Sequence, residues 1–414
     1  MHEPCEPFCL DVDGEPDLTP EIRRKNRVVG YIATFLVVFV LGTTEIFASW
    51  YVFRLGGTPL ESGIAFGIFG FVYMFSPAIG GRLSDRVGRK KTLLVSTAAY
   101  IGVILLYLLP SIQTIHLIAI RTVEGFVYGF IAPTIEGMVA ELEPESQVAT
   151  LGNFSTAWSA SMILPPMIIA YLAGIYGDLS SIYVILAIEV FSLVIVALFL
   201  QAYKRRPESE EIENPHATDF PTQGEKASKV SPLFITSYLS VMLWGVVSTV
   251  ILALFPSYIE NLVLLGYPFA TEDFGNLLLI WNIVRTVGFI AIARMPGEYM
   301  KTVILLGAVL SASSGFLLFS FIDIWVFAIA MVLSGLGVGF NYLGALYLVV
   351  SATDLEKGAH AGLVESMGGV GLFLGPIIGG WLTGFGLTFP YLMYAVLAVV
   401  ILVIMMVLLR RDKT

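Results

Sequence analysis

The sequence predicts an all-α membrane protein in which twelve transmembrane helices form two pseudo-repeated bundles of six. Three observations predict this fold. The 414 residues are 57% hydrophobic and 13% charged, with a mean hydropathy of +0.83, a composition typical of proteins embedded in a bilayer. The chain contains twelve apolar stretches of about 20 residues, the length that crosses a bilayer. The stretches on either side of a central polar segment share a pattern of glycines.

Each apolar stretch is expected to be a helix, because lipid cannot satisfy the hydrogen-bonding groups of an open backbone. In order, the predicted spans are residues 28–50, 60–81, 92–110, 114–140, 148–174, 179–202, 231–255, 273–293, 302–320, 324–351, 359–385 and 389–409.

The one long polar segment within the chain, residues 201–231, is charged, contains Pro and is expected to be a flexible linker. It divides the chain into two halves. The predicted organisation is a cytoplasmic N-terminal tail at 1–27, a six-helix bundle at 28–202, a cytoplasmic linker at 203–230, a second six-helix bundle at 231–409 and a cytoplasmic tail at 410–414.

The basic residues predict the orientation of the helices. Of the 23 Lys and Arg residues, only Arg54 falls in a predicted external loop and only Arg121 and Arg285 fall inside spans. The others occupy segments that are cytoplasmic if both termini are, as the positive-inside rule requires. No cleavable apolar signal precedes the first span, so we expect an integral protein of the plasma membrane. The net charge of −9 resides largely in tails and loops, and nucleic acid is not an expected partner.

The two halves repeat with a constant offset in residue number. Gly125 and Gly129 correspond to Gly335 and Gly339, and Pro166 corresponds to Pro376. Parallel repeats of this kind place the substrate site at the interface of the halves near the middle of the membrane. The pattern therefore predicts alternating access.

A motif between the second and third spans points to a family. The chain reads GRLSDRVGRKK there, with the motif positions Gly81, Asp85, Arg86, Gly88, Arg89 and Lys90. It resembles G-x-x-x-D-R-x-G-R-R, the cytoplasmic signature of the major facilitator superfamily, and differs in Lys for the last Arg. The second half has no clear copy of the motif.

The residue types of this motif suit a cytoplasmic gate. Gly81 would permit close helix contact and Gly88 a tight turn. Asp85 would face the positive N-terminal end of a neighbouring helix, which the resemblance identifies as the eleventh, at residues 358–362. Glu136, near the cytoplasmic end of the fourth span, is expected to act with this gate.

Two further resemblances concern coupling. Arg121 and Gly125 match the R-x-x-x-G pattern of the family's fourth helix, whose arginine is associated with proton coupling. The drug-antiporter branch carries G-P and two small residues in its fifth helix, but this chain has Pro165 and Pro166 followed by Met and Ile. The arginine pattern favours proton coupling. The different sequence in the fifth helix weakens the case for antiport.

Ionisable residues within the membrane are costly to bury, so each indicates a function or a partner. Glu45 in the first span and Arg121 in the fourth lie at similar predicted depth and could pair. A conformational change that separates them would remove the charge that stabilises the ionised carboxylate, and so could drive protonation. We therefore predict proton coupling through Glu45, Arg121 and Glu124. The alternatives are a static ion pair and pairing of Arg121 with Glu124, one turn away.

The substrate cavity is expected to draw on polar and aromatic side chains of both halves. Membrane helices also carry aromatic residues at lipid faces, so packing is the alternative for each of them. The predicted cavity residues are Tyr128, Trp158, Trp244, Asn282, Arg285, Asn341 and Tyr342.

These features predict a secondary transporter of a small organic solute, coupled to protons and exporting a lipophilic compound. Proton-coupled uptake of a polar solute, such as a sugar or organic anion, is the alternative. A receptor or scaffold on the same fold is the alternative of another class. No phosphate-binding loop and no convergent catalytic or metal-binding set is seen, so no enzyme activity, cofactor or metal is expected. Cys5 and Cys9 are expected to be reduced residues of the tail, and the family resemblance implies a monomer.

Overall fold

The computed structural model describes residues 19–142, 154, 156–203, 231–352 and 357–411. Within these ranges the chain is helical and contains no strand. Nine of the described helices are long and apolar enough to cross a membrane, or ten when the bent pair of α2 and α3 counts as one span. Helices α4 and α13 occupy the other two predicted spans, so the twelve-helix fold is confirmed. Predictions for Cys5, Cys9 and the linker at 204–230 lie outside the described residues.

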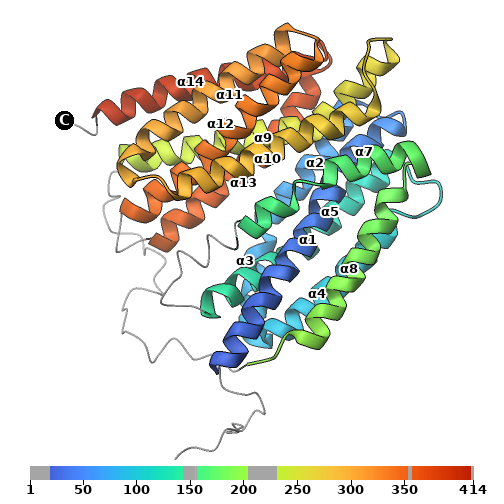
Figure 1. Ribbon diagram of the computed structural model, residues 1–414, viewed down its shortest axis with the longest axis vertical. Helices are drawn as coiled ribbons and strands as arrows, with labels where there is room; N and C mark the ends of the chain where they lie inside the picture. The colour runs from blue at the N-terminus through green and yellow to red at the C-terminus, as the bar shows by residue number, and fades with distance from the viewer. Residues whose placement is uncertain (1–18, 143–153, 155, 204–230, 353–356, 412–414) are drawn as a thin grey trace, which may run out of the picture.

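The described helices form two sets, one from each half of the chain (Figure 1). The first set consists of α1 (Pro20–Arg54), α2 (Pro59–Tyr73), α3 (Ser76–Val87), α4 (Arg89–Leu106), α5 (Thr114–Leu142), α7 (Pro165–Tyr176) and α8 (Ser180–Phe199). The second consists of α9 (Pro232–Leu264), α10 (Thr271–Ala293), the short 3₁₀ helix η3 (Gly297–Tyr299), α11 (Met300–Ser320), α12 (Ile324–Ala352), α13 (Lys357–Leu382) and α14 (Phe389–Arg411).

Local sequence signals explain where several helices begin. Thr19 caps α1, its hydroxyl accepting a hydrogen bond from the Ile22 N–H at 3.3 Å, and Pro20 occupies the first turn. Thr58 and Glu61 form a capping box at the start of α2. Gly88, with φ of 100°, makes the turn between α3 and α4 in a region that favours glycine.

Several helices differ from the hydropathy prediction in their ends or in their continuity. Helix α1 begins at Pro20 rather than at residue 28, and α9 continues through Pro256 to Leu264. The second span is bent by 42° between α2 and α3, and the fifth is interrupted at residues 162–164, before Pro165. Proline has no N–H to donate, which explains the interruption.

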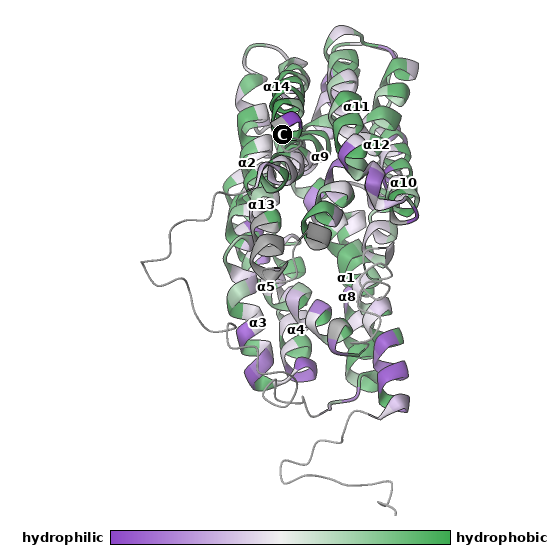
Figure 2. Ribbon diagram, turned by 90° about the vertical axis from the view of Figure 1, so that its left-hand side faces the viewer, coloured by the Kyte–Doolittle hydropathy of each residue, from purple (hydrophilic) through white to green (hydrophobic). Residues whose placement is uncertain are grey.

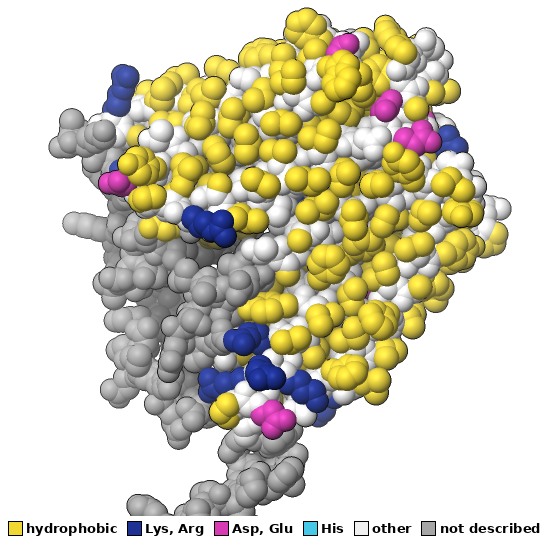
Figure 3. All heavy atoms as spheres, in the orientation of Figure 1, with side chains coloured by type: hydrophobic (Ala, Val, Ile, Leu, Met, Phe, Trp, Pro, Cys, Tyr) yellow, Lys and Arg dark blue, Asp and Glu magenta, His cyan; other side chains and the backbone are white. Residues whose placement is uncertain are grey.

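The exposed surface of the helices is apolar. Large hydrophobic side chains are exposed on the outer faces of α4, α8 and α14, including Val95, Leu198 and Val403. Figure 3 shows hydrophobic side chains over the sides of the helices and Lys and Arg gathered toward one end. Figure 2 shows hydrophilic residues near the ends of α3 and α4. This distribution fits a protein surrounded by lipid.

The two halves press together at one end, called here the outer end, which carries the start of α2. The helix pairs that join them include α2 with α13, α7 with α10, α1 with α9 and α2 with α9. A Cβ added at Gly63 would overlap the carbonyl oxygen of Pro376, and one added at Gly380 would lie 2.5 Å from that of Pro59. Away from this end the two sets are inclined to each other (Figure 1). The opposite end, with the start of α1, is called the inner end.

We expect Gly63→Val to lower the free energy of unfolding by about 1–3 kcal/mol, because overpacking forces a backbone to move. Gly102→Val is the control, since no atom lies within 4 Å of a Cβ built there. Thermal unfolding in detergent measures both variants. Equal stabilities would show that α2 and α13 have room for the added side chain.

Candidate functional site

A cavity of about 210 Å³ lies between the two halves. Its wall is built by α1, α2, α5, α9, α10, α12 and α13 together with Phe154, Trp158 and Met162, so both halves contribute. Most of the lining is aromatic or aliphatic, and its charged side chains are Glu45, Glu136 and Arg285. A mostly apolar cavity with few polar groups is typical of small-molecule sites.

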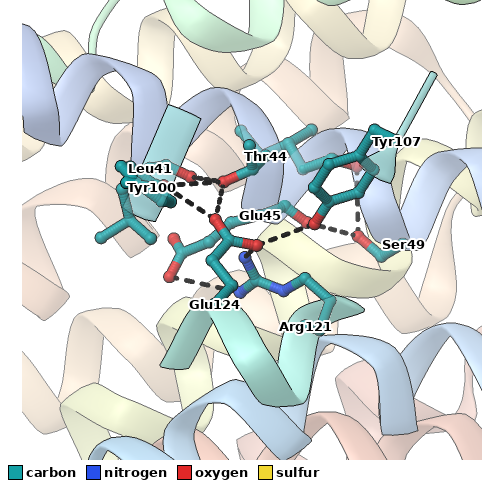
Figure 4. Close-up of polar contacts among 9 residues, drawn as sticks. Leu41, Thr44, Glu45, Ser49, Tyr100, Tyr107, Arg121 and Glu124 are labelled. Atoms are coloured by element: carbon teal, nitrogen blue, oxygen red, sulfur yellow. Dashed lines mark hydrogen bonds and ion pairs between the residues drawn. The ribbon is translucent and has the colours of Figure 1, made fainter. Parts of the chain in front are cut away.

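Next to this cavity, Glu124 lies at the centre of a closed polar cluster (Figure 4). Its carboxylate accepts hydrogen bonds from Tyr100 at 2.8 Å, from Tyr107 at 2.7 Å and from Thr44. It also pairs with the Nη1 atom of Arg121 at 2.8 Å. Both members of this ion pair are fully buried. The donors on four side chains therefore saturate the two oxygens of Glu124 and fix its position.

Glu45 makes a much looser contact with the same arginine. Its Oε1 atom lies 3.8 Å from Arg121 Nη2, and its side chain is 13% exposed in the cavity wall. The Arg121 guanidinium also lies over the Phe69 ring, with 4.4 Å to the centroid. Arg121 therefore has one tight partner, Glu124, and one carboxylate at longer range, Glu45. The pairing with Glu124 that the sequence left open is the shorter of the two.

Five of the seven predicted cavity residues line the same cavity. They are Tyr128, Trp158, Trp244, Arg285 and Tyr342. Trp244 and Tyr342 pack together with 4.6 Å between ring centroids. Whether these side chains contact a substrate remains a prediction.

The other two predicted cavity residues, Asn282 and Asn341, are not among the residues that line this cavity. Asn282 donates to the Leu278 carbonyl at 3.0 Å, inside its own helix. Asn341 accepts a hydrogen bond from Ser240 at 3.2 Å and donates to Ser311 at 3.4 Å, so it joins α12 to α9 and α11. Successive helix positions point in different directions, and Tyr342 faces the cavity while Asn341 faces its neighbouring helices.

Sequence reasoning missed several aromatic residues of the lining. Phe69, Tyr73 and Phe289 belong to the cavity wall. Phe69 packs against both Tyr128 and Arg121. Their sequence signal, aromatic residues in apolar helices, is the same as that of lipid-facing positions.

At the inner end, the motif residues surround Arg89. Its Nη2 atom lies 2.9 Å from Asp85 and 2.6 Å from Glu141, and its Nη1 atom donates to Ser84. Glu141, which the sequence analysis did not identify, also accepts from Tyr203 at 2.8 Å. The motif thus ties α3 and α4 to α5. The expected contact of Asp85 with residues 358–362 involves side chains outside the described part of the chain.

The remaining residues predicted for the gate differ in exposure and in contacts. Arg86 is exposed and Lys90 is partly exposed. The close helix contact expected at Gly81 occurs instead at Gly80, where an added Cβ would overlap the backbone of Gly129; at Gly81 the nearest atom is 4.0 Å away. Glu136, expected at the gate, lies in the lining of the cavity.

Polar contacts close the outer end. The Trp50 indole N–H of α1 donates to the buried Glu260 carboxylate of α9 at 3.0 Å. Tyr171 donates to Asn276 at 3.2 Å, joining α7 to α10. These bonds link the two halves at the end where the helices also pack most closely.

We expect Trp50→Phe to open the outer end, because it leaves the buried Glu260 without its indole donor. Spin labels at Leu55 and Leu265, with Cys5 and Cys9 replaced by Ser, report the separation of α1 and α9 by electron–electron resonance. Longer distances are expected in Trp50→Phe but not in the control Trp325→Phe, whose tryptophan is 76% exposed. An unchanged distance distribution in Trp50→Phe would exclude this bond as a gate contact.

Comparison with known proteins agrees with this architecture. A family model described as Major Facilitator Superfamily matches residues 30–297 and 297–414. The multidrug resistance protein MdtG of an Escherichia coli strain is 29% identical over 240 residues, a match that spans 56% of this chain and 58% of that protein. An uncharacterized MFS-type transporter of Methanocaldococcus jannaschii is 22% identical over 381 residues, covering 91% of this chain and 96% of the relative.

Solved structures of transporters share the fold. The nucleoside transporter NupG superposes with a TM-score of 0.70 at 15% identity, covering 94% of this chain and 99% of that one. The human organic anion transporter MFSD10 gives a TM-score of 0.63 at 15% identity, covering 94% and 100%. At these identities the likeness concerns the fold alone.

Proposed function

Because the chain belongs to the Major Facilitator Superfamily, we propose that it moves a small organic solute by alternating access and that Glu45 couples this movement to protons. The observation that carries the proposal is the unequal pairing of Arg121. Glu124 holds it at 2.8 Å within a closed cluster, whereas Glu45 lies 3.8 Å away in the cavity wall. Glu45 can therefore exchange protons with the cavity while the buried pair stays intact.

The same geometry supports export of a lipophilic solute. An ionised Glu45 beside aromatic walls attracts a cationic or polarisable solute, and protonation of Glu45 weakens that attraction. Solute and proton then occupy the cavity in turn, which is exchange. The similarity to a multidrug resistance protein over part of the chain supports this direction.

The test is movement of a lipophilic cationic dye into inverted membrane vesicles that contain the native chain. We expect uptake when the vesicle interior is acidified and loss of uptake when an uncoupler dissipates the gradient. Vesicles without the protein are the control. Dye movement at the same rate with and without the gradient would contradict proton coupling.

Co-transport of an organic anion with a proton is the second candidate. The observation that favours it is Arg285, a buried guanidinium in the cavity wall with unused N–H groups. In this case an added solute would move protons in its own direction, and a pH indicator inside the vesicles separates the two candidates.

We also propose that the inner end faces the cytoplasm and that the protein works as a monomer. Basic residues gather toward one end of the molecule in Figure 3, as the positive-inside rule requires of a cytoplasmic face. The complete solute cavity within one chain supports a monomer.

A further inference from the structure

We propose that Arg285 binds an anionic group of the solute, and that the solute is an aromatic or otherwise apolar acid. This inference rests on the proposed function in assigning the cavity between the halves to the solute, and it develops the second candidate, movement of an organic anion. It is an alternative to the cationic solute of the first candidate.

Arg285 is buried with unused hydrogen-bond donors. Arg285 is 2% exposed, and its Nε and Nη2 atoms make no hydrogen bond to any residue that the structure describes. Arg121, the other buried arginine of the membrane region, is paired with Glu124. A buried charge without a close anionic partner is costly, so we expect Arg285 to bind a ligand that supplies the negative charge.

Two tryptophan rings hold the Arg285 guanidinium. It lies over Trp281 of its own helix, 4.8 Å from the ring centroid, and over Trp158 of the first half, 5.4 Å away. These rings fix the plane of the guanidinium without using its N–H donors. A fixed planar fork of donors suits a carboxylate, which accepts two parallel hydrogen bonds.

Aromatic side chains line the cavity that contains the Arg285 guanidinium. Trp244, Tyr342 and Phe289 form an aromatic wall of the same cavity, with Phe289 and Tyr342 centroids 6.0 Å apart. A cavity of about 210 Å³ with one charged fork and an aromatic wall fits an acid with a compact ring system.

The site also touches both halves of the protein. Beside Arg285, the Thr286 hydroxyl of α10 lies 2.8 Å from the hydroxyl of Ser159 in the first half. Trp158, which packs on the guanidinium, precedes Ser159 in the chain. A ligand on Arg285 therefore lies where the halves meet and can influence their relative movement.

Charge in the cavity also bears on coupling. Glu45 and Arg285 line the same cavity but are not within ion-pair distance of each other. A bound anion and an ionised Glu45 repel each other, whereas a protonated Glu45 tolerates the anion. An anionic solute would thus travel with a proton, which is the second candidate above.

Binding to the purified chain in lipid nanodiscs tests the proposal with three probes of equal ring system. They are 1-naphthylacetate, its methyl ester and 1-naphthylmethylammonium, and calorimetry measures their affinities. We expect the acid to bind about 10- to 100-fold more tightly than the ester, the gain of a charge-assisted hydrogen bond, and more tightly than the cation. In Arg285→Gln the acid and ester should bind within about 3-fold of each other.

Two matched variants guard the interpretation. Arg54→Gln removes an exposed arginine at the outer end and should keep the native preference. Arg285→Lys retains the positive charge and should keep part of the preference for the acid over the ester. If Arg285→Gln binds neither probe, loss of this preference in Arg285→Lys would overturn the proposal. An unchanged preference in Arg285→Gln, a preference of the native chain for the ester or the cation, or no binding of any probe would also overturn it. Loss of proton coupling with retained acid preference would refute only the function of Glu45.

Discussion

Glu45→Gln is expected to reduce solute movement driven by a proton gradient by at least about 100-fold, because a single proton carrier is removed. The amide has nearly the shape of the carboxyl group but cannot exchange a proton. Solute-for-solute exchange, which needs no net proton movement, should persist in the variant. Both activities can be measured in proteoliposomes, with a pH jump for the driven reaction and labelled solute on both sides for exchange.

Glu298→Gln is the matched control for this experiment. It removes an exposed carboxylate in the short helix between α10 and α11, outside the cavity, and should transport as the native chain does. Gradient-driven transport that survives Glu45→Gln would exclude Glu45 as the carrier. Loss of exchange together with driven transport would indicate that Glu45 binds solute rather than protons alone.

Glu124→Leu is expected to lower the free energy of unfolding by about 3–5 kcal/mol, because it leaves the buried guanidinium of Arg121 without its close partner. Chemical unfolding in detergent micelles, followed by helix content, measures the effect. Tyr100 and Tyr107 would also lose their acceptor, which adds to the cost.

The double variant Arg121→Met/Glu124→Leu serves as the control for this prediction. Removing both members of the fully buried pair leaves neither without its partner, so much of the lost stability should return. Native stability of Glu124→Leu combined with loss of coupling would instead assign the proton to Glu124 and show that the buried pair is not structural.

The fold could be predicted from the sequence to the extent that hydropathy reports lipid contact. The twelve spans follow from apolar length, but the ends of α1 and α9 do not. Residues 20–27 are charged, and Pro256 and Glu260 interrupt the apolar run of α9. In both places the helix continues beyond the apolar window because capping and packing stabilise it. The bend after Tyr73 coincides with Pro77 in the first turn of α3, a local signal that a hydropathy window does not register.

The site could be predicted where depth in the membrane was sufficient information. The proximity of Glu45 and Arg121 follows from opposite helix directions and similar depth. The unequal length of the two Arg121 contacts does not follow from depth. Glu124 is held by Tyr100 of α4 and by Tyr107 at the C-terminal end of α4, and the sequence does not show that this helix lies beside it. The direction in which each side chain points around its helix axis could not be predicted either. Asn341 and Tyr342 are neighbours in sequence but face different surroundings, as do Gly80 and Gly81.

Site-resolved titration of Glu45 determines whether this carboxylate takes up the transported proton. Infrared difference spectroscopy of the reconstituted protein detects the carbonyl stretch of a protonated carboxylic acid as the pH is lowered. We expect a band that appears in the native chain, is absent in Glu45→Gln and remains in Glu124→Gln. A band that persists unchanged in Glu45→Gln, or that disappears only in Glu124→Gln, would contradict the assignment of the transported proton to Glu45.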